Sequence, residues 1–546
     1  MRALIRGLVR TVSFTVTLAT TASAQDSFRS ERATDPGFSH WFLAWSPLRP
    51  IAELPRVLPR APAPPDLGGS PRPRVGLFWT AGNPASLAEG VRDTYADIRF
   101  TGASDGGTYR RPLDPDAATV RQVAGLAWRP LGPRGAAAGL VTIDEESLDD
   151  ASFAGMLSPH SSNPLVVTDT TSPAMRRTRA RLQGALGYRV RRWGAGVSVG
   201  YEAREHRTQD ARFPRIGRVS TPAVLVGISH PIPTGRGAMI VAVTGRWVGG
   251  YETVTLIPEP GTSTVHQLEG YAEPDERVVS QPPAYYRRVN RTARAFGAGL
   301  AGTIAGVEWV LSGERTLRDE DHFSERRADP ATDTWEANGY GIVSSAQRSL
   351  LRRQGLITVV AHYVSLNGAA RRSDLDGDIF RASESALALT ADARYTRDGS
   401  PWSFGLTFGV ERETRVRNDF IAEVGTEIQT WNPGAAVAVA RKLHPRITIA
   451  LGASASLVST SAAIPSPDGL GPVYQRLIAP ELALYAAQKT PVAASASALY
   501  TLRSGTDIVL RNRWESLSPR VSGSGLPFSP TGDRTLWSVS AGFVLR

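Results

Sequence analysis

Long runs in which apolar and polar residues alternate are the feature that most constrains the fold of this chain. From about residue 76 to the C-terminus these runs dominate, and residues 193–202, 402–411 and 537–545 show the pattern clearly. A period of two is typical of β-strands with one apolar and one polar face. The runs extend over about 10 to 16 residues, beyond the usual 5 or 6 of soluble strands and close to the 9 to 11 that cross a bilayer.

The connections between these runs alternate between tight turns and longer polar segments. The predicted tight turns are residues 131–134, 191–192, 231–236, 303–305, 352–354, 397–400, 443–445 and 489–490. The longer segments are residues 147–175, 207–215, 252–284, 318–338, 367–383, 417–426, 461–470 and 504–533. Transmembrane β-barrels have this asymmetry, with short periplasmic turns and long extracellular loops, whereas a soluble sandwich or propeller has no physical reason to keep it.

These patterns predict an all-β fold, a transmembrane antiparallel up-and-down β-barrel over residues 75–546. Counting hairpins back from the C-terminus gives about 18 strands, within a range of 16–20, with the first at about residues 91–101. The sheet has to close, because an open edge would leave unpaired backbone groups in hydrocarbon. A mean hydropathy of −0.18 excludes a polytopic helical membrane protein, and the absence of cysteine excludes disulfides and thiolate metal sites.

The N-terminus has the three parts of an export signal. Arg2, Arg6 and Arg10 precede a short apolar stretch at residues 11–21, and Ala22-Ser23-Ala24 supplies a small-residue cleavage site. We therefore expect a signal peptide at residues 1–24, followed by a proline- and arginine-rich periplasmic segment at residues 25–74. An exported barrel is expected in the outer membrane, with outer-membrane lipid and the assembly machinery as partners.

The charge balance does not indicate nucleic-acid binding. The net charge is +11, from 62 Lys+Arg against 51 Asp+Glu, but the cations are scattered and only Lys442 and Lys489 are lysines. A nucleic-acid-binding protein would gather its cations on one face or carry a recognizable binding motif. We predict no nucleic-acid partner.

Alternation also predicts which charged residues face the lumen. Arg177, Arg179, Arg181 and Arg189 share one parity, opposite apolar residues such as Leu182. An arginine facing lipid near the midplane would cost about 2–4 kcal/mol, so this row is assigned to the lumen. The same argument assigns Glu202, Arg204, Asp392 and Arg394 to the lumen. Tryptophans near strand ends are assigned to interfacial girdles, namely Trp128, Trp193, Trp247, Trp402 and Trp537.

No motif indicates an enzyme or a cofactor. Residues 196–200 have the Gly-x-Ser-x-Gly spacing of a nucleophile elbow, but they lie within a strand instead of at a sharp strand-to-helix turn. Asp374, Asp376 and Asp378 are loop candidates for calcium, yet the glycine and glutamate positions of an EF-hand are not met, so a solvated acidic loop is favoured. We predict no catalytic residues, no metal and no cofactor.

Three stretches carry a resemblance to known barrels. Residues 77–88, Leu-Phe-Trp-Thr-Ala-Gly-Asn-Pro-Ala-Ser-Leu-Ala, resemble the Asn-Pro-Ala opening of some barrel families, including fatty-acid-transporter-like ones. With residues 163–169 and 210–215, they resemble an uncharacterised Gram-negative outer-membrane β-barrel family of unknown function. The resemblance implies a fold and a location but no activity. The chain departs from the common pattern in ending with Arg546, where such barrels commonly end in phenylalanine.

Two functions are consistent with these observations. The first is a porin-like channel or facilitated-diffusion transporter for small solutes, anionic ones among them, because the arginine row would concentrate anions. The alternative is a non-conducting binding, adhesion or secretion-accessory barrel that acts through its long outer loops, especially residues 147–175 and 252–284. A barrel enzyme is a third class, for which the sequence offers no assignable site.

Overall fold

A computed structural model provides the structure of most of the chain. It describes residues 62–63, 67, 77–78, 82–110, 114–150, 163–169, 174–209, 215–234, 237–257, 264–270, 275–278, 285–324, 333–350, 354–375, 377–466, 470–471, 474–520 and 532–545. The predicted signal peptide, most of the predicted periplasmic segment and Arg546 lie outside the described residues.

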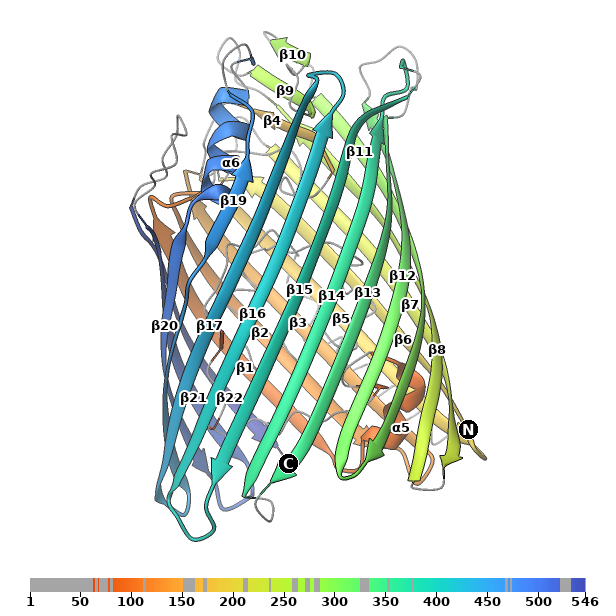
Figure 1. The fold of residues 1–546 in the computed structure, drawn as a ribbon, viewed down its shortest axis with the longest axis vertical. Coiled ribbons are helices and arrows are strands. Elements are labelled where there is room, and N and C mark those ends of the chain that lie inside the picture. The colour runs from red at the N-terminus through yellow and green to blue at the C-terminus, as the bar shows by residue number, and fades with distance from the viewer. Residues whose placement is uncertain are drawn as a thin grey trace.

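The described chain forms a closed antiparallel β-barrel of 18 strands, which confirms the predicted fold class (Figure 1). Consecutive strands are neighbours around the barrel, and β18 and β19 together make one interrupted strand against β17. The barrel strands are β1 (Tyr95–Gly107), β2 (Ala117–Pro130), β3 (Gly135–Asp149), β5 (Met175–Val190), β6 (Trp193–Thr208), β7 (Arg215–Thr234), β8 (Gly237–Leu256), β11 (Tyr285–Ile304), β12 (Val307–Ser324), β13 (Asp333–Leu350), β14 (Gly355–Arg371), β15 (Asp378–Thr396), β16 (Trp402–Asp419), β17 (Val424–His444), β18 (Ile447–Ser456), β19 (Ser459–Ala463), β20 (Lys489–Thr501), β21 (Asp507–Pro519) and β22 (Arg534–Leu545).

The first and last strands close the barrel. β1 pairs with β2 on one side and with β22 on the other, in a register that runs from Ala96 opposite Leu545 to Gly107 opposite Arg534. The buried Arg534 guanidinium reinforces this seam: Nε donates to Asp105 Oδ1 at 2.8 Å and Nη1 to Asp114 Oδ2 at 3.2 Å. Residues more than 400 positions apart in sequence are thereby joined by both backbone and side chains.

Tight turns gather at one end of the barrel and longer connections at the other. β1 begins and β22 ends at the tight-turn end, which the predicted asymmetry assigns to the periplasm (Figure 1). Several predicted long loops are extensions of the strands, since β16 and β17 are joined by only residues 420–423. The strands are therefore longer than the membrane-crossing runs alone, up to 21 residues in β17.

One predicted turn is wrong. Residues 489–490 begin β20, and the tight turn lies between β20 and β21, at residues 502–506. Residues before Lys489, which that turn placed in a strand, form η3 (Tyr474–Ile478) and α6 (Ala479–Ala486) at the outer end. The α6 sequence, Ala-Pro-Glu-Leu-Ala-Leu-Tyr-Ala, is rich in helix formers, and its proline lies in the first turn, where the missing N–H costs least.

The two faces of the wall follow the predicted alternation. Trp193, Trp247, Trp402 and Trp537 are exposed on the outer face, as expected of girdle residues. Trp128 is wrongly assigned to a girdle, because its side chain is buried inside the barrel and stacks on Tyr95 with ring centroids 4.0 Å apart. Alternation places Trp128 on the inner face of β2, and a position near a strand end does not by itself put a tryptophan on the lipid-facing side. Among the described residues no helix is long and apolar enough to cross a membrane.

The seam predicts a stability test. Arg534→Ala would leave the buried Asp105 carboxylate without this guanidinium, and breaking a buried ion pair costs about 3–5 kcal/mol. We expect the folded, fast-migrating band on a gel to convert to the unfolded band at a lower temperature than in the parent. Arg503→Ala, at an exposed position in the turn between β20 and β21, is the matched control and should leave the conversion temperature unchanged.

Candidate functional site

A short N-terminal segment lies against the inner wall at the periplasmic end of the barrel. This inner segment comprises Leu77, Phe78 and residues 82–91, and it includes η1 (Pro84–Ser86) and α5 (Leu87–Gly90), which Figure 1 shows at the lower end. Asn83 starts η1 with a side-chain turn, because its Oδ1 accepts a hydrogen bond from the Ala85 N–H at 2.9 Å. The Asn83 amide nitrogen lies 3.5 Å from the Val243 carbonyl oxygen of β8, as a donor to it.

Glycines on three neighbouring strands make room for this segment. A Cβ at Gly187 would lie 2.6 Å from the Pro84 carbonyl oxygen, and one at Gly194 would lie 2.7 Å from the Ala85 carbonyl oxygen. A Cβ at Gly196 would overlap the Pro84 carbonyl, and one at Gly227 would overlap the Asn83 side chain. We call Gly187, Gly194, Gly196 and Gly227 the glycine cradle. Only hydrogen at these four positions lets the backbone of the inner segment approach the wall so closely.

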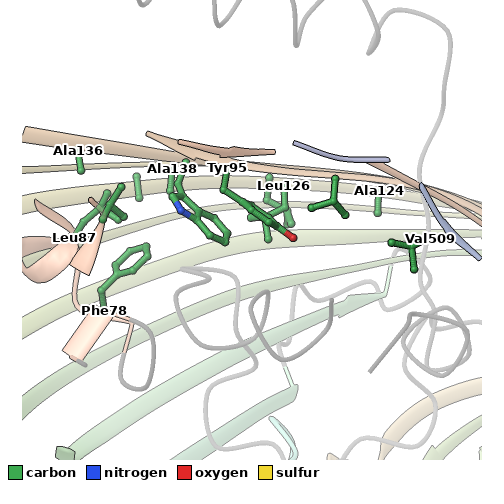
Figure 2. Close-up of a cluster of buried hydrophobic side chains, with 13 residues drawn as sticks. Phe78, Leu87, Tyr95, Ala124, Leu126, Ala136, Ala138 and Val509 are labelled. Atoms are coloured by element: carbon green, nitrogen blue, oxygen red, sulfur yellow. The ribbon is translucent and has the colours of Figure 1, made fainter. Parts of the chain in front are cut away.

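Apolar side chains complete the docking of the inner segment. Phe78 and Leu87 are almost fully buried and pack in one cluster with wall residues of β1, β2, β3, β5, β21 and β22 (Figure 2). Leu77 belongs to a second cluster with Ala242, Ala301 and Val310. Further along the chain towards the N-terminus, Pro62 contacts the wall at Gly409 and Gly434, where added Cβ atoms would lie 3.6 Å and 2.6 Å from it. Part of the predicted periplasmic segment therefore lies inside the barrel.

At the outer end, segments from two connections form a small separate sheet. β4 (Leu165–Asp169) pairs with β9 (Thr264–Glu269), and β9 pairs with β10 (Asp275–Val278). Figure 1 shows this sheet across the upper end of the barrel. β4 comes from the predicted loop 147–175 and β9 from the predicted loop 252–284.

A buried polar network holds β4 to the wall. Asn163 repeats the side-chain turn of Asn83, with its Oδ1 accepting from the Leu165 N–H at 2.9 Å. Its amide nitrogen donates to Glu320 Oε2 at 2.7 Å and lies 3.0 Å from His322 Nε2. Arg287 donates to the Leu165 carbonyl oxygen at 3.1 Å and to His322 Nδ1 at 2.6 Å. We call Asn163, Arg287, Glu320 and His322 the outer latch.

An apolar core fills the lumen beside the latch. Leu165 of β4 and Tyr474, Leu482 and Tyr485 of the η3–α6 segment pack with inward-facing wall residues, among them Trp335, Leu366, Phe380 and Ile428. The end of α6 is fixed by its Leu484 carbonyl oxygen, which accepts hydrogen bonds from Lys489 Nζ at 2.7 Å and Tyr109 Oη at 3.2 Å. Burial raises the pKa of the Tyr109 hydroxyl, which therefore remains a donor. The segments at the outer end thus form a packed lid.

The predicted arginine row is matched by carboxylates. Arg179 contacts Glu202 at 3.1 Å and Asp144 at 3.7 Å, and Arg181 and Arg204 form ion pairs with the same Glu202. Arg177 lies 3.8 Å from Glu146. Four guanidinium groups therefore face three carboxylates, so the local charge is much lower than the arginines alone indicate. Sequence reasoning missed Asp144 and Glu146, although the alternation in residues 135–149 puts both on the inner face of β3.

The remaining predicted lumen residues lie in two other places. Arg189 is exposed at the periplasmic end of β5, on the side of α5. Burial raises the pKa of the Glu89 carboxyl on α5, and the Arg189 guanidinium partly offsets this shift. Asp392 and Arg394 on β15 pair with each other at 2.8 Å, and Thr407 Oγ1 donates to Asp392 at 3.0 Å.

The loop carboxylates are occupied by arginines. Asp374 accepts from Arg372 Nε at 2.6 Å, and Asp378 lies between Arg371 and Arg381, at 2.8 Å from each. Asp376 lies outside the described residues. Within the described ranges, no three His, Cys, Asp or Glu side chains are grouped so that they could hold a metal ion. In the Gly-x-Ser-x-Gly stretch, Gly196 belongs to the glycine cradle.

Comparison with known proteins places the chain in a family. A model described as a family of unknown function (DUF6850) matches residues 84–545. No curated protein matches the sequence. Among solved structures, the ferric citrate transporter FecA in its unliganded form is similar over 83% of this chain and 79% of its own, at 9% identity and a TM-score of 0.43.

Two further barrels are similar at the same level. The copper transporter OprC matches 83% of this chain and 81% of its own, at 9% identity and a TM-score of 0.39. The ferric preacinetobactin receptor BauA of Acinetobacter baumannii matches 83% of this chain and 80% of its own, at 9% identity and a TM-score of 0.36. At identities and TM-scores this low, the likeness carries nothing about ligands.

The glycine cradle predicts how the inner segment can be displaced. The chain has no cysteine, so Ala85→Cys would introduce its only thiol, at a buried position under the cradle. We expect this thiol to react slowly with a maleimide in the parent background. It should react much faster when Gly196→Val forces the segment away from the wall. Gly341→Val is the matched control, because a Cβ at this lumen-facing glycine meets no atom within 4 Å. Equal reactivity in all three backgrounds would contradict the docking.

Proposed function

The chain belongs to this family of unknown function, DUF6850, and from that premise we propose that it is a gated conduit for small polar solutes across the outer membrane. The observation that carries the proposal is the pair of docked segments at opposite ends of one polar lumen. The inner segment and the outer lid are both small compared with the barrel, and neither contributes a strand to its wall.

The chemistry of the wall supports passage of polar solutes. Barrels of 16–18 strands leave an aqueous channel unless something fills it. The inner face of this barrel carries charged and hydroxyl side chains, for example the ion pair of Arg246 with Glu314 at mid-height and, nearer the outer end, that of Arg417 with Glu384 at 2.7 Å. Because these charges are paired, they offer hydrogen-bonding sites without a strong net field. We therefore propose that polar solutes in general pass through the lumen, without the preference for anions that the arginine row alone would give.

The docking chemistry supports movement at both ends. The inner segment is held by backbone contact with glycines, by two small apolar clusters and by the side-chain hydrogen bond from Asn83 to the wall. The outer latch adds few hydrogen bonds beyond those that Glu320 already makes with Arg291 and Arg318. Undocking therefore leaves Glu320 paired, so the carboxylate is not stranded when the lid opens.

The outer-membrane location is also a proposal. It is supported by the outward apolar face, the exposed tryptophans and the closed ladder, which leaves no edge unpaired in hydrocarbon. We propose outer-membrane lipid and the assembly machinery as the partners that such a barrel requires. We also propose that the protein is not an enzyme, because the nucleophile-like spacing at residues 196–200 lies within a strand, where Gly196 serves the glycine cradle.

The alternative is a non-conducting barrel that binds a partner through its outer loops. The described parts of the predicted loops 147–175 and 252–284 do not favour it: β4 and β9 pair with each other across the barrel end, and β4 is anchored to the wall through the latch. Conductance is the measurement that separates the two functions.

Two gates in series predict a non-additive result in single-channel recording. We expect low conductance from the parent. Gly196→Val opens only the inner end, and Asn163→Ala with Leu165→Ala loosens only the lid, so each should raise conductance modestly. Their combination should raise it far more than the sum of the two. The Leu165 and Asn163 changes lie on the lid, so they spare the wall of the barrel.

The controls for this experiment are variants that leave both segments in place. Gly341→Val faces the lumen, and Asn367→Ala lies on the exposed outer face of β14. Both should conduct like the parent. A combined variant that remains folded by gel migration and still carries no current would overturn the proposal and favour the binding barrel.

A further inference from the structure

Two arginines on the outer face of the wall differ from those inside it. On β11 the outward residues from Ile304 to Phe296 are apolar or small, and those from Arg294 outward are charged or polar up to Arg288. On β12 the first charged outward residue is Arg315, after Val307, Trp309, Leu311 and Gly313, and one further apolar residue, Leu317, lies beyond it. Ile304 and Arg294 are ten residues apart, close to the 9 to 11 that cross hydrocarbon. Both arginines therefore lie close to the outer limit of the apolar band, within one outward residue of it on β12.

Neither arginine has a carboxylate partner among the described residues. Arg294 and Arg315 are both exposed. The Arg315 guanidinium lies 5.7 Å from the Tyr340 ring centroid, and its Nε is 3.4 Å from Asn338 Oδ1. Arg294 lies directly opposite Trp247 on β8 and Leu317 on β12. The arginines inside the barrel, in contrast, are largely held in ion pairs such as Arg179 with Glu202.

The register brings the two guanidinium groups onto one patch. Arg294 is opposite Leu317, and Arg315 is two residues from Leu317 on the same face. Such diagonal neighbours in an antiparallel pair have Cα atoms about 7–8 Å apart, within reach of one ligand held by two long side chains. The second diagonal neighbour of Arg294 on β12 is Asp319, and the two form no ion pair within the described chain. The patch is therefore cationic at its lower edge, next to the apolar band.

We propose that Arg294 and Arg315 bind the phosphorylated headgroup of an outer-leaflet lipid. A guanidinium at the edge of hydrocarbon requires a counter-ion, and its planar donors match phosphate oxygens in bidentate fashion. Trp247 and Tyr340 flank the pair with rings that favour the headgroup level. The acyl chains of the same lipid would lie on Phe296 and Leu311 below, both exposed. The inference rests on the proposed outer-membrane location and is independent of solute conduction.

The same arrangement recurs as a single arginine elsewhere on the outer face. Arg412 on β16 lies over the Trp431 ring at 5.3 Å, directly above the apolar run that ends in Phe408 and Val410. Arg412 lacks a second cation beside it at this boundary, since its opposite residue on β15 is Leu387. Unlike Arg412, the Arg294–Arg315 pair can therefore hold one phosphate with two guanidinium groups.

Native mass spectrometry of the purified full-length protein tests the proposal with lipid A as the probe. We expect bis-phosphorylated lipid A to remain bound, and the same lipid with both phosphates removed to bind more weakly. Arg294→Gln with Arg315→Gln should lower the bound fraction of the phosphorylated lipid by about tenfold or more, since each charge-assisted contact contributes roughly that factor. All variants should keep the parent's heat-modifiable migration on gels, because both positions are exposed.

Two controls make the result specific. Arg288→Gln removes a charge from the same face of β11 but higher up, where Arg288 bonds to Asn290 at 2.9 Å, and it should bind like the parent. Inorganic phosphate at millimolar concentration should not displace the lipid, because it lacks the acyl chains. Equal loss in Arg288→Gln, no loss in the double variant, or displacement by free phosphate would each overturn the proposal.

Discussion

Pairing of the backbone around a closed ring is the constraint on which the rest of the structure depends. A strand that faces hydrocarbon has no water to satisfy its N–H and C=O groups, so each barrel strand needs a neighbour on both sides. The pairing of β1 with β22 completes this ring, and Arg534 reinforces it by reaching Asp105 on the first strand and Asp114 beyond it. Closure also sets the size of the lumen, because diameter grows with strand number.

Closure creates a lumen that the protein then has to manage. At mid-height the wall is lined by ion pairs, which satisfy buried charges and leave little net field. At each end of the barrel, the inward-facing residues are of a different type, and a segment of chain packs against them. The periplasmic end offers glycines, so that backbone can approach backbone, and the outer end offers large apolar residues such as Trp335 and Phe380, so that a lid can pack. The residue types on the inner face therefore differ with the segment of chain that packs against them.

The two Asn-Pro stretches show how local sequence and distant structure combine. In both, the asparagine side chain caps its own backbone two residues on, which the local sequence favours. Their roles differ because of what they meet: Asn83 lies over Gly227, whereas Asn163 inserts between Glu320 and His322. The stretches could be singled out from the sequence, but the glycines and the latch that receive them come from strands up to about 160 residues away.

The sequence alone determined the fold class, the approximate strand number and the face of most wall residues, because alternation and connection length are local properties that a bilayer enforces. It failed where a residue's surroundings come from elsewhere in the chain. Trp128 packs inside on Tyr95, residues 474–486 fold as helix within the lid, and the arginine row is met by Asp144 and Glu146 of a neighbouring strand. Only the tertiary structure decided what fills the lumen and which charges are paired, since register and closure bring together residues that no sequence pattern connects.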